Sequence, residues 1–443
     1  MTAATSHDHR AHAELRRSFG WRTVAAAGGL LSTLLLTVIV YRTLDARDAA
    51  VFFAILAALS IGPLMGRLGL GPNVIRLLAA EGRQDRRRAI ASSHLVATAL
   101  LSMASAPAVA VIATWSLRGQ SHYLPVLGLT ALAITAESVR LTLSDVFAAT
   151  GRVRASVATT HHVRSMVVLP LVGIAALAVA APTLLEVMAA YTAVACVQLG
   201  IALIGARHDV GRHRGAGAAS LRGAIASGSK LFTLDLAAFL GLSGTVWLSA
   251  IVFDPAAAAQ YSAAATLALQ VTILESLAAL AVTPPAARMW AAGRRDEVVG
   301  ILSAVATLGT AVTAAVVLVL VIAGPALLGF AYGESMRGAG LLLVIMAAGG
   351  LAKTAFGVNI TVLIVSGHLT EASRTALAVL AVSVPAAIAA AVIGGPLALA
   401  VVSALSLTAT ALAQWRCARV TVGMAPRARI RIGRAWQILA TSR

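Results

Sequence analysis

Long apolar stretches recur along the whole sequence and constrain the fold more than any other feature. A helix needs about 20 predominantly apolar residues to cross a bilayer. Twelve such spans are predicted, at 22–41, 49–70, 90–115, 123–149, 163–181, 184–206, 229–253, 257–283, 298–323, 338–366, 374–394 and 397–415. Charged residues make up only 12% of the chain, about half the fraction in an average soluble domain. The sequence therefore predicts an all-α polytopic membrane protein with 12 transmembrane helices.

Basic residues are distributed unevenly among the connections between these spans. The formal net charge is +18. Most of the arginines lie in the two tails and in the even-numbered connections, whereas the odd-numbered connections hold only Arg42, Arg47, Arg118 and Arg337. Because basic loops stay on the cytoplasmic side, both termini are expected in the cytoplasm. The protein itself is expected in the bacterial cytoplasmic membrane. The basic excess thus indicates topology and attraction to anionic lipid, in preference to nucleic-acid binding.

The loop after the second span is echoed after the eighth. Residues 76–85 follow the pattern R-x-x-A-A-E-G-R-x-D, and residues 288–296 follow R-x-x-A-A-G-R-R-D. A proline precedes each first arginine by four residues, at Pro72 and Pro284. The echo predicts a duplicated unit of six helices, so that the two lobes form a parallel pseudo-two-fold repeat with a cleft between them.

The spans and the repeat divide the chain into five parts. These are a cytoplasmic N-terminal tail at 1–21, an N-lobe at 22–206, a cytoplasmic linker at 207–228, a C-lobe at 229–415 and a basic cytoplasmic C-terminal tail at 416–443. The linker is rich in glycine and arginine, which favours flexibility. The C-terminal tail alternates basic and apolar residues, so it is expected either to lie on anionic lipid or to be solvated.

The chain lacks the features that a membrane enzyme would need. No external connection exceeds about a dozen residues, so none can build an external active site. No Walker motif, dinucleotide fingerprint or nucleophile elbow is present. The two cysteines, Cys196 and Cys417, fall in different environments and predict neither a disulfide nor a metal site. We expect no enzymatic activity and no cofactor.

Ionisable residues inside the predicted spans are the candidate functional residues. Each costs about 2.5–3.5 kcal/mol at the centre of a membrane helix, so it normally faces a partner or a watery cavity. The candidates are Arg67 in the second span, Glu137, Arg140 and Asp145 in the fourth, Asp235 in the seventh, Glu275 in the eighth and Lys353 in the tenth.

The cationic members of this set suit an anionic substrate. Arg67 lies between Gly66 and Gly69, and small residues there allow a helix break or close packing. A buried guanidinium matches a phosphate with a planar fork of donors. Arg67, Lys353 and Arg140 are therefore the predicted substrate contacts. The alternatives are that Arg67 snorkels to the interface and that Lys353 forms a salt bridge to a neighbouring helix.

The acidic members are candidates for coupling transport to an ion. Glu137, Asp145, Asp235 and Glu275 are the predicted ion relay. Each also has a structural explanation. Glu137 and Arg140 are spaced i,i+3 and can form an ion pair that only holds the bundle together. Asp235 is close to the cytoplasmic edge and can be solvated, and Glu275 can form an interhelical hydrogen bond as a neutral acid.

The segment from Phe52 through the run 69–82, GLGPNVIRLLAAEG, resembles the second-helix region of bacterial polysaccharide flippases. These belong to the multidrug/oligosaccharidyl-lipid/polysaccharide exporter superfamily. The resemblance implies a V-shaped pair of six-helix lobes that moves an undecaprenyl-diphosphate-linked oligosaccharide by alternating access. It also implies a cationic cleft lined by the first, second, seventh and eighth helices. Arg67, Asp235 and Glu275 fall on the last three of these helices, but the first helix has no charge between Thr23 and Tyr41.

The resemblance implies a lipid-linked glycan and membrane lipids as partners, with a glycan polymerase and glycosyltransferases in the same pathway. Two other functions stay open. One is a cation-coupled multidrug exporter of the same superfamily. The other is a non-transporting membrane component, or a membrane enzyme, of a polysaccharide assembly machinery. A major-facilitator fold is a structural rival because it also has twelve helices in parallel halves.

Overall fold

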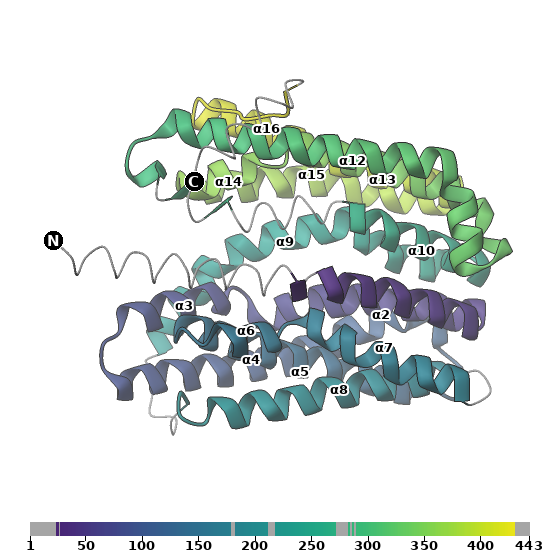
Figure 1. The fold of residues 1–443 in the computed structure, drawn as a ribbon, viewed down its shortest axis with the longest axis horizontal. Coiled ribbons are helices and arrows are strands. Elements are labelled where there is room, and N and C mark those ends of the chain that lie inside the picture. The colour runs from purple at the N-terminus through teal and green to yellow at the C-terminus, as the bar shows by residue number, and fades with distance from the viewer. Residues whose placement is uncertain are drawn as a thin grey trace. The chain divides into compact units, whose positions relative to one another are not determined.

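Helices are the only regular elements in the part of the chain that the computed structural model describes, which is residues 24–25, 27–178, 182–210, 218–271, 282–283, 286–287 and 289–429 (Figure 1). Each predicted span overlaps at least in part with one of these helices. The chain is therefore all-α, as its sequence predicts.

The helices group into two compact units. The first contains Ala58–Ser229 together with the chain up to Leu44, and the second contains Asp45–Ala57 together with Lys230–Arg443. The short segment 45–57 belongs to the second unit although it precedes most of the first. One reason is that the Trp247 indole Nε1 donates a hydrogen bond to the carbonyl oxygen of Ala54 at 2.9 Å.

The first unit opens with the helix Ala27–Thr43. The elements that follow are α2 (Ala46–Arg67), which belongs to the first unit only from Ala58 onward, α3 (Leu70–Ala80), α4 (Gln84–Ala113), η1 (Trp115–Leu117), α5 (Tyr123–Ala149), α6 (Val153–Ala158), α7 (His161–Ala178) and α8 (Leu184–Ala206). A capping box starts α8, because the Thr183 hydroxyl accepts from the Glu186 backbone and the Glu186 carboxylate accepts from the Thr183 backbone.

The second unit continues from α9 (Ala218–Val252), whose first turns belong to the first unit. Its other elements are α10 (Pro255–Val271), α12 (Arg295–Tyr332), η2 (Glu334–Ala339), α13 (Gly340–Phe356), α14 (Asn359–Val365), α15 (Leu369–Ala389), the π-helical turn η3 (Ala390–Gly394) and α16 (Gly395–Thr421). The echoed loops occupy matching places: the first joins α3 to α4, and the second turns at Gly293 just before α12.

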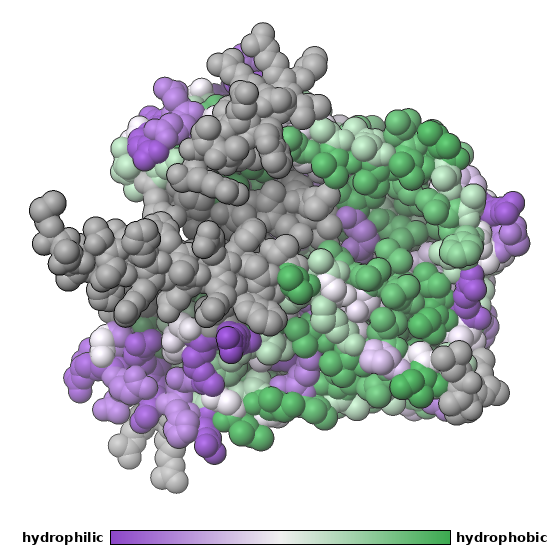
Figure 2. All heavy atoms as spheres, viewed as in Figure 1, coloured by the Kyte–Doolittle hydropathy of each residue, from purple (hydrophilic) through white to green (hydrophobic). Residues whose placement is uncertain are grey.

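The surface identifies a membrane protein. In the described ranges, seven helices are long and apolar enough to cross a bilayer, or eight if Phe232–Gly241 and Ser243–Val252 form one bent span. Large apolar side chains such as Phe330 and Ile393 are more than four-fifths exposed. Figure 2 shows hydrophobic side chains over the flanks of the helices and hydrophilic ones gathered toward their ends. Lipid contact explains this pattern, since water would disfavour such apolar patches.

Two parts of the predicted organisation differ from the structure. The helix α9 begins at Ala218, within the stretch predicted as a linker, and residues 211–217 lie outside the described ranges. The predicted C-terminal tail first continues α16 to Thr421 and then packs on its own unit. The Asn359 amide donates to the carbonyl oxygen of Pro426 at 2.9 Å, and the backbone N–H of Arg429 donates to the Thr307 hydroxyl at 2.9 Å.

The C-terminal tail packs on the second unit because its backbone forms hydrogen bonds there and its small side chains make apolar contacts. The N–H of Ala428 donates to the carbonyl oxygen of Ala355 at 3.1 Å, and its side chain contacts a buried apolar cluster that includes Val298 and Leu302. Backbone polar groups in an extended segment need such partners when they leave water. Up to Arg429, the alternating pattern therefore marks a segment held against the protein. Residues 430–443 lie outside the described ranges.

A break separates α2 from α3 and positions the residues that follow. Leu68 has φ 38° and Gly69 has φ 78°, both in the left-handed region. A Cβ built on Gly69 would overlap the backbone of Gly228 at the start of α9. The break requires glycine at position 69 for two reasons, conformation and close backbone approach.

Replacing Gly69 with alanine is therefore expected to destabilise the protein by at least about 1–2 kcal/mol, the usual cost of a left-handed conformation for a residue with a Cβ. The thermal midpoint in detergent, measured by size-exclusion chromatography after heating, should fall. The matched control is Gly128→Ala, since a Cβ at Gly128 meets no atom within 4 Å. Equal midpoints for the two variants would contradict the structural role of this break.

Candidate functional site: charged side chains around α5

The helix α5 presents polar residues on two different faces. Ser138, Thr142 and Asp145 follow one another at four- and three-residue intervals, so they share one face. Glu137, Arg140 and Ser144 share another face by the same spacing. Each face contacts a different set of helices, and each has its own charged cluster.

The first face packs closely against α2. A Cβ built on Gly62 would overlap the side chain of Ile134, and one on Gly66 would overlap Ser102 and Ser138. Small residues allow two membrane helices to approach in this way. Close packing along this line brings the last residue of α2, Arg67, beside Asp145.

Arg67 and Asp145 form an ion pair at the break in the second span. The Nη2 atom of Arg67 donates to Oδ2 of Asp145, with 14% and 22% of the two side chains exposed. The Nε of Arg67 is buried and has no acceptor among the described residues. A Cβ on Gly71 would overlap both charged groups. Arg67 is thus held through its Nη2 atom, while the neighbouring Nε–H donor is unsatisfied among these described residues.

The residues that follow the break continue this polar region into α4. Arg76 donates from Nη2 to the Asn73 amide oxygen at 3.0 Å, and the Asn73 amide contacts Nε2 of His94 at 3.0 Å. The other ring nitrogen of His94 lies 2.8 Å from the carbonyl oxygen of Ile90. With a proton on Nδ1, His94 donates to Ile90 and accepts from Asn73. The echoed motif therefore fixes Arg76 through a hydrogen-bonded chain.

The second face of α5 forms a buried cluster of one carboxylate and two guanidinium groups. Arg140 donates from Nη2 to Oε1 of Glu137, and its Nε lies 3.2 Å from Oε2. Arg164 of α7 donates to Oε2 of Glu137. Arg140 also donates to the carbonyl oxygen of Thr159. The side chains of Glu137 and Arg140 are at most 1% exposed and that of Arg164 is 5% exposed.

This cluster has an excess positive charge, which its surroundings offset. The Arg164 guanidinium lies over the ring of Tyr191 in α8, 4.4 Å from the ring centre, and the electron-rich face of an aromatic ring attracts a cation. The carbonyl of Thr159 provides a further partial negative charge. The cluster joins α5, α6, α7 and α8 within the first unit. This geometry favours the structural explanation for Glu137 and Arg140, which is an ion pair that holds the helix bundle together.

The structure places the predicted site residues in several surroundings. It brings Arg67 together with Asp145, and Glu137 together with Arg140. Arg140 was predicted as a substrate contact, but its side chain is completely buried and its donors are engaged by Glu137 and Thr159. Asp235 in α9 is exposed, and Lys353 in the last turn of α13 is half-buried. Both lie in the second unit, and Glu275 lies outside the described residues.

Sequence reasoning missed two residues of this region, Arg164 and Tyr191. Arg164 is an ionisable group inside a predicted apolar span, the same signal that identified Arg67. Tyr191 has no such signal, because its role depends on which helices pack together. Within the described ranges, no group of three or more His, Cys, Asp or Glu residues is arranged to hold a metal ion.

Comparisons with known proteins agree with this architecture. No family model and no curated protein matches the chain. The fold is nevertheless similar to that of solved multi-pass membrane transporters and flippases, one of which is described as a member of the MOP superfamily.

Three solved structures carry this conclusion. The lipid II flippase MurJ in an inward closed conformation aligns with a TM-score of 0.69 and 10% identity, over 95% of this chain and 90% of that one. The Vibrio cholerae MATE transporter VcmN aligns at 0.63 with 14% identity, over 93% and 98%. An inward-facing multidrug resistance MATE transporter of the MOP superfamily aligns at 0.62 with 12% identity, over 94% and 96%. All three are transporters or flippases.

Proposed function

We propose that this protein is a flippase that moves an undecaprenyl-diphosphate-linked oligosaccharide across the bacterial cytoplasmic membrane by alternating access. One observation carries the proposal: Arg67 stands at a break in a membrane helix with its Nη2 paired to Asp145 and with a buried Nε that has no acceptor in the described part of the chain. A phosphate oxygen is a suitable acceptor for that donor, because charge-assisted hydrogen bonds from guanidinium to phosphate are short and strong.

Asp145 has a defined role in this proposal. It holds the Arg67 guanidinium in place when no substrate is bound, so that the diphosphate does not have to order a mobile side chain. A guanidinium can contact a carboxylate and a phosphate at the same time, since it has five N–H donors in a planar fork. Gly71 leaves the space that both charged groups occupy.

The other predicted residues take separate roles. Lys353 is the candidate cation of the second unit for the same substrate. Arg140 is enclosed with Glu137 and Arg164, so we assign it to holding α5 in place. Asp145, Asp235 and Glu275 remain the candidates for an ion relay. Proton or cation flow would drive the return step, as would the membrane potential, which contributes about 2.3 kcal/mol per charge per 100 mV.

Several other features support the proposal. The arrangement of basic residues supports cytoplasmic termini. The partners in this account are the lipid-linked glycan, membrane lipids, and a polymerase and glycosyltransferases of the same pathway. The similarity in fold to a lipid II flippase favours a lipid-linked substrate. The similarity to two MATE transporters equally supports the second candidate, a cation-coupled multidrug exporter.

A translocation assay in proteoliposomes separates the two candidates. Purified protein is reconstituted with a fluorescent undecaprenyl-diphosphate-linked sugar, and a membrane-impermeant quencher reports how much label changes leaflet. A flippase is expected to equilibrate the label faster than empty vesicles do. Efflux of a cationic dye along an ion gradient, without movement of the lipid-linked sugar, would support the exporter and reject the flippase.

A further inference from the structure

The first unit has a strongly basic end, separate from the Arg67 site. Three segments meet there: residues 81–88 before and within the start of α4, residues 150–154 after α5, and residues 205–209 at the end of α8. Together they contain seven arginines and three carboxylates, which leaves a net formal charge of +4. Because α4 and α8 are apolar helices that start or end here, this end is expected at the depth of lipid head groups.

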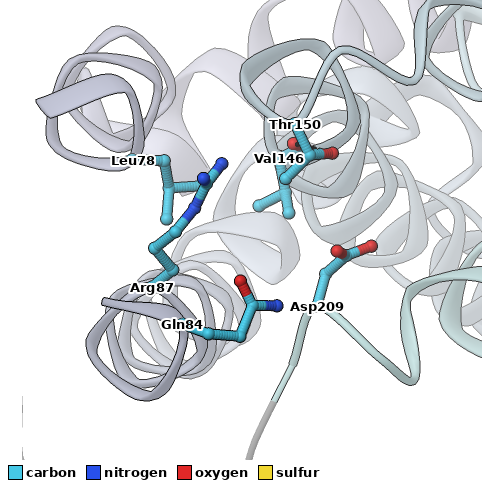
Figure 3. Close-up of a pocket in the computed structure, with 6 residues that line it drawn as sticks. All are labelled: Leu78, Gln84, Arg87, Val146, Thr150 and Asp209. Atoms are coloured by element: carbon cyan, nitrogen blue, oxygen red, sulfur yellow. Dashed lines mark hydrogen bonds between the residues drawn. The ribbon is translucent and has the colours of Figure 1, made fainter. Parts of the chain in front are cut away.

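A cavity of about 220 Å³ opens at this end. Its lining comes from α3, α4, α5 and the turn after α8, and consists of Leu78, Gln84, Arg87, Val146, Thr150 and Asp209. Figure 3 shows Arg87 and Gln84 reaching into this space from one side, with Thr150 and Asp209 on the opposite side. Leu78 and Val146 give the cavity an apolar part beside this polar one.

Neighbouring arginines fix the turn after α8, and they also neutralise the acidic residue in the cavity. Arg152 donates from Nη1 to Oδ2 of Asp209 and to the carbonyl oxygen of Gly205, both at 2.8 Å. Arg88 donates from Nε to the carbonyl oxygen of His208 at 2.9 Å. These contacts engage Arg88 and Arg152 and offset the charge of Asp209. The turn that contributes Asp209 is therefore held in place from two sides.

Arg87 differs from these neighbours. Its guanidinium, which is half-buried at the cavity, has no ion pair and no hydrogen bond to the described residues. The cavity thus has one uncompensated positive charge. It also has oxygen atoms that can accept hydrogen bonds: the second carboxylate oxygen of Asp209, the amide oxygen of Gln84 and the hydroxyl oxygen of Thr150, whose proton is donated to the carbonyl oxygen of Val146 at 3.0 Å.

We propose that this cavity binds the head group of an anionic phospholipid whose phosphodiester carries a hydroxylated alcohol, such as phosphatidylglycerol. The single negative charge of the phosphodiester pairs with Arg87. The two hydroxyl groups of the phosphatidylglycerol head group donate to two of the three acceptors, which are Asp209, Gln84 and Thr150. The apolar residues Leu78 and Val146 contact the start of the glycerol backbone. A bound lipid would join α3, α4, α5 and the turn after α8, and would stabilise the first unit.

Native mass spectrometry with titrated lipid tests this proposal on the full chain. Wild-type protein is expected to bind phosphatidylglycerol more tightly than phosphatidylmethanol, which has the same charge but no head-group hydroxyl. Arg87→Gln is expected to weaken phosphatidylglycerol binding by about tenfold or more, the effect of one charge-assisted hydrogen bond. The control is Arg86→Gln, which removes the same charge from the neighbouring position. The Arg86 side chain is exposed, and its Nη1 lies 4.0 Å from Oε2 of Glu81. This variant should change binding by less than about twofold.

Three outcomes would overturn the proposal. Equal losses in the two arginine variants would show non-specific attraction to the basic end. Equal binding of the two lipids would remove the role of the hydroxyl acceptors. Competition by inorganic phosphate alone, at concentrations comparable to the lipid, would identify a site for the free anion. The proposal also predicts an effect on stability. Without lipid, Arg87→Gln should have the same thermal midpoint as wild-type, and with phosphatidylglycerol its midpoint should be lower.

Discussion

Replacing Arg67 with alanine is expected to lower translocation of a diphosphate-linked lipid by about ten- to a hundredfold. Each hydrogen bond from a charged group contributes about 1.5–3 kcal/mol, and a tenfold change corresponds to about 1.4 kcal/mol. The readouts are leaflet exchange in proteoliposomes and growth of a flippase-deficient strain. Protein amount in the membrane must be measured alongside, because loss of Arg67 also leaves Asp145 without its ion-pair partner.

A charge exchange separates substrate binding from a merely structural ion pair. The double variant Arg67→Asp with Asp145→Arg keeps one charge of each sign at the contact between α2 and α5. If the pair only holds the helices together, this variant should regain transport. We expect it to reach the membrane and remain inactive, since the cation then extends from α5 and no longer from the end of α2 at the helix break.

Replacing Glu137 with glutamine is expected to cause the largest loss of stability. The variant leaves the buried guanidinium groups of Arg140 and Arg164 without the carboxylate that contacts both. Breaking a buried ion pair in this way costs about 3–5 kcal/mol, a large part of the roughly 5–15 kcal/mol that stabilises a typical folded protein. The thermal midpoint in detergent and the yield of monodisperse protein should both fall sharply.

The matched control for this variant is Glu297→Gln. Glu297 also contacts an arginine three residues away in sequence, Arg294, but both side chains are more than half exposed. Exposed pairs contribute about 0.2–1 kcal/mol, so the control should remain close to wild-type. Removing the whole cluster with Glu137→Leu, Arg140→Met and Arg164→Met should recover part of the lost stability. A Glu137→Gln protein as stable as the control would show that the cluster does not hold α5.

Much of this fold could be predicted from the sequence because membrane helices have a strong local signal. The length and polarity of the apolar runs located the spans. The glycines around Arg67 indicated either a helix break or close packing, and the structure shows both. The pairing of Glu137 with Arg140 followed from their spacing on one helix. These features depend on residues that are close together in the chain, so no knowledge of the tertiary packing was needed.

The remaining features depend on contacts between distant segments. Asp145 is 78 positions from Arg67, and only the packing of α2 on α5 brings the two together. Arg164 joins Glu137 in the same way across 27 positions. The tail 416–443 was expected from its alternating composition either to lie on anionic lipid or to be solvated. That composition does not reveal that Thr307, Ala355 and Asn359 offer hydrogen-bond partners to the backbone of residues 426–429.

The central claim is that the Arg67 guanidinium, whose Nε–H donor has no acceptor among the described residues, receives the diphosphate of the substrate. Its most direct test is the equilibrium affinity of purified protein for undecaprenyl diphosphate and for undecaprenol, measured for wild-type and for Arg67→Gln. We predict that wild-type binds the diphosphate at least about tenfold more tightly than the alcohol, and that Arg67→Gln abolishes this preference while binding of the alcohol is unchanged. A preference for the diphosphate that survives in Arg67→Gln would contradict the account.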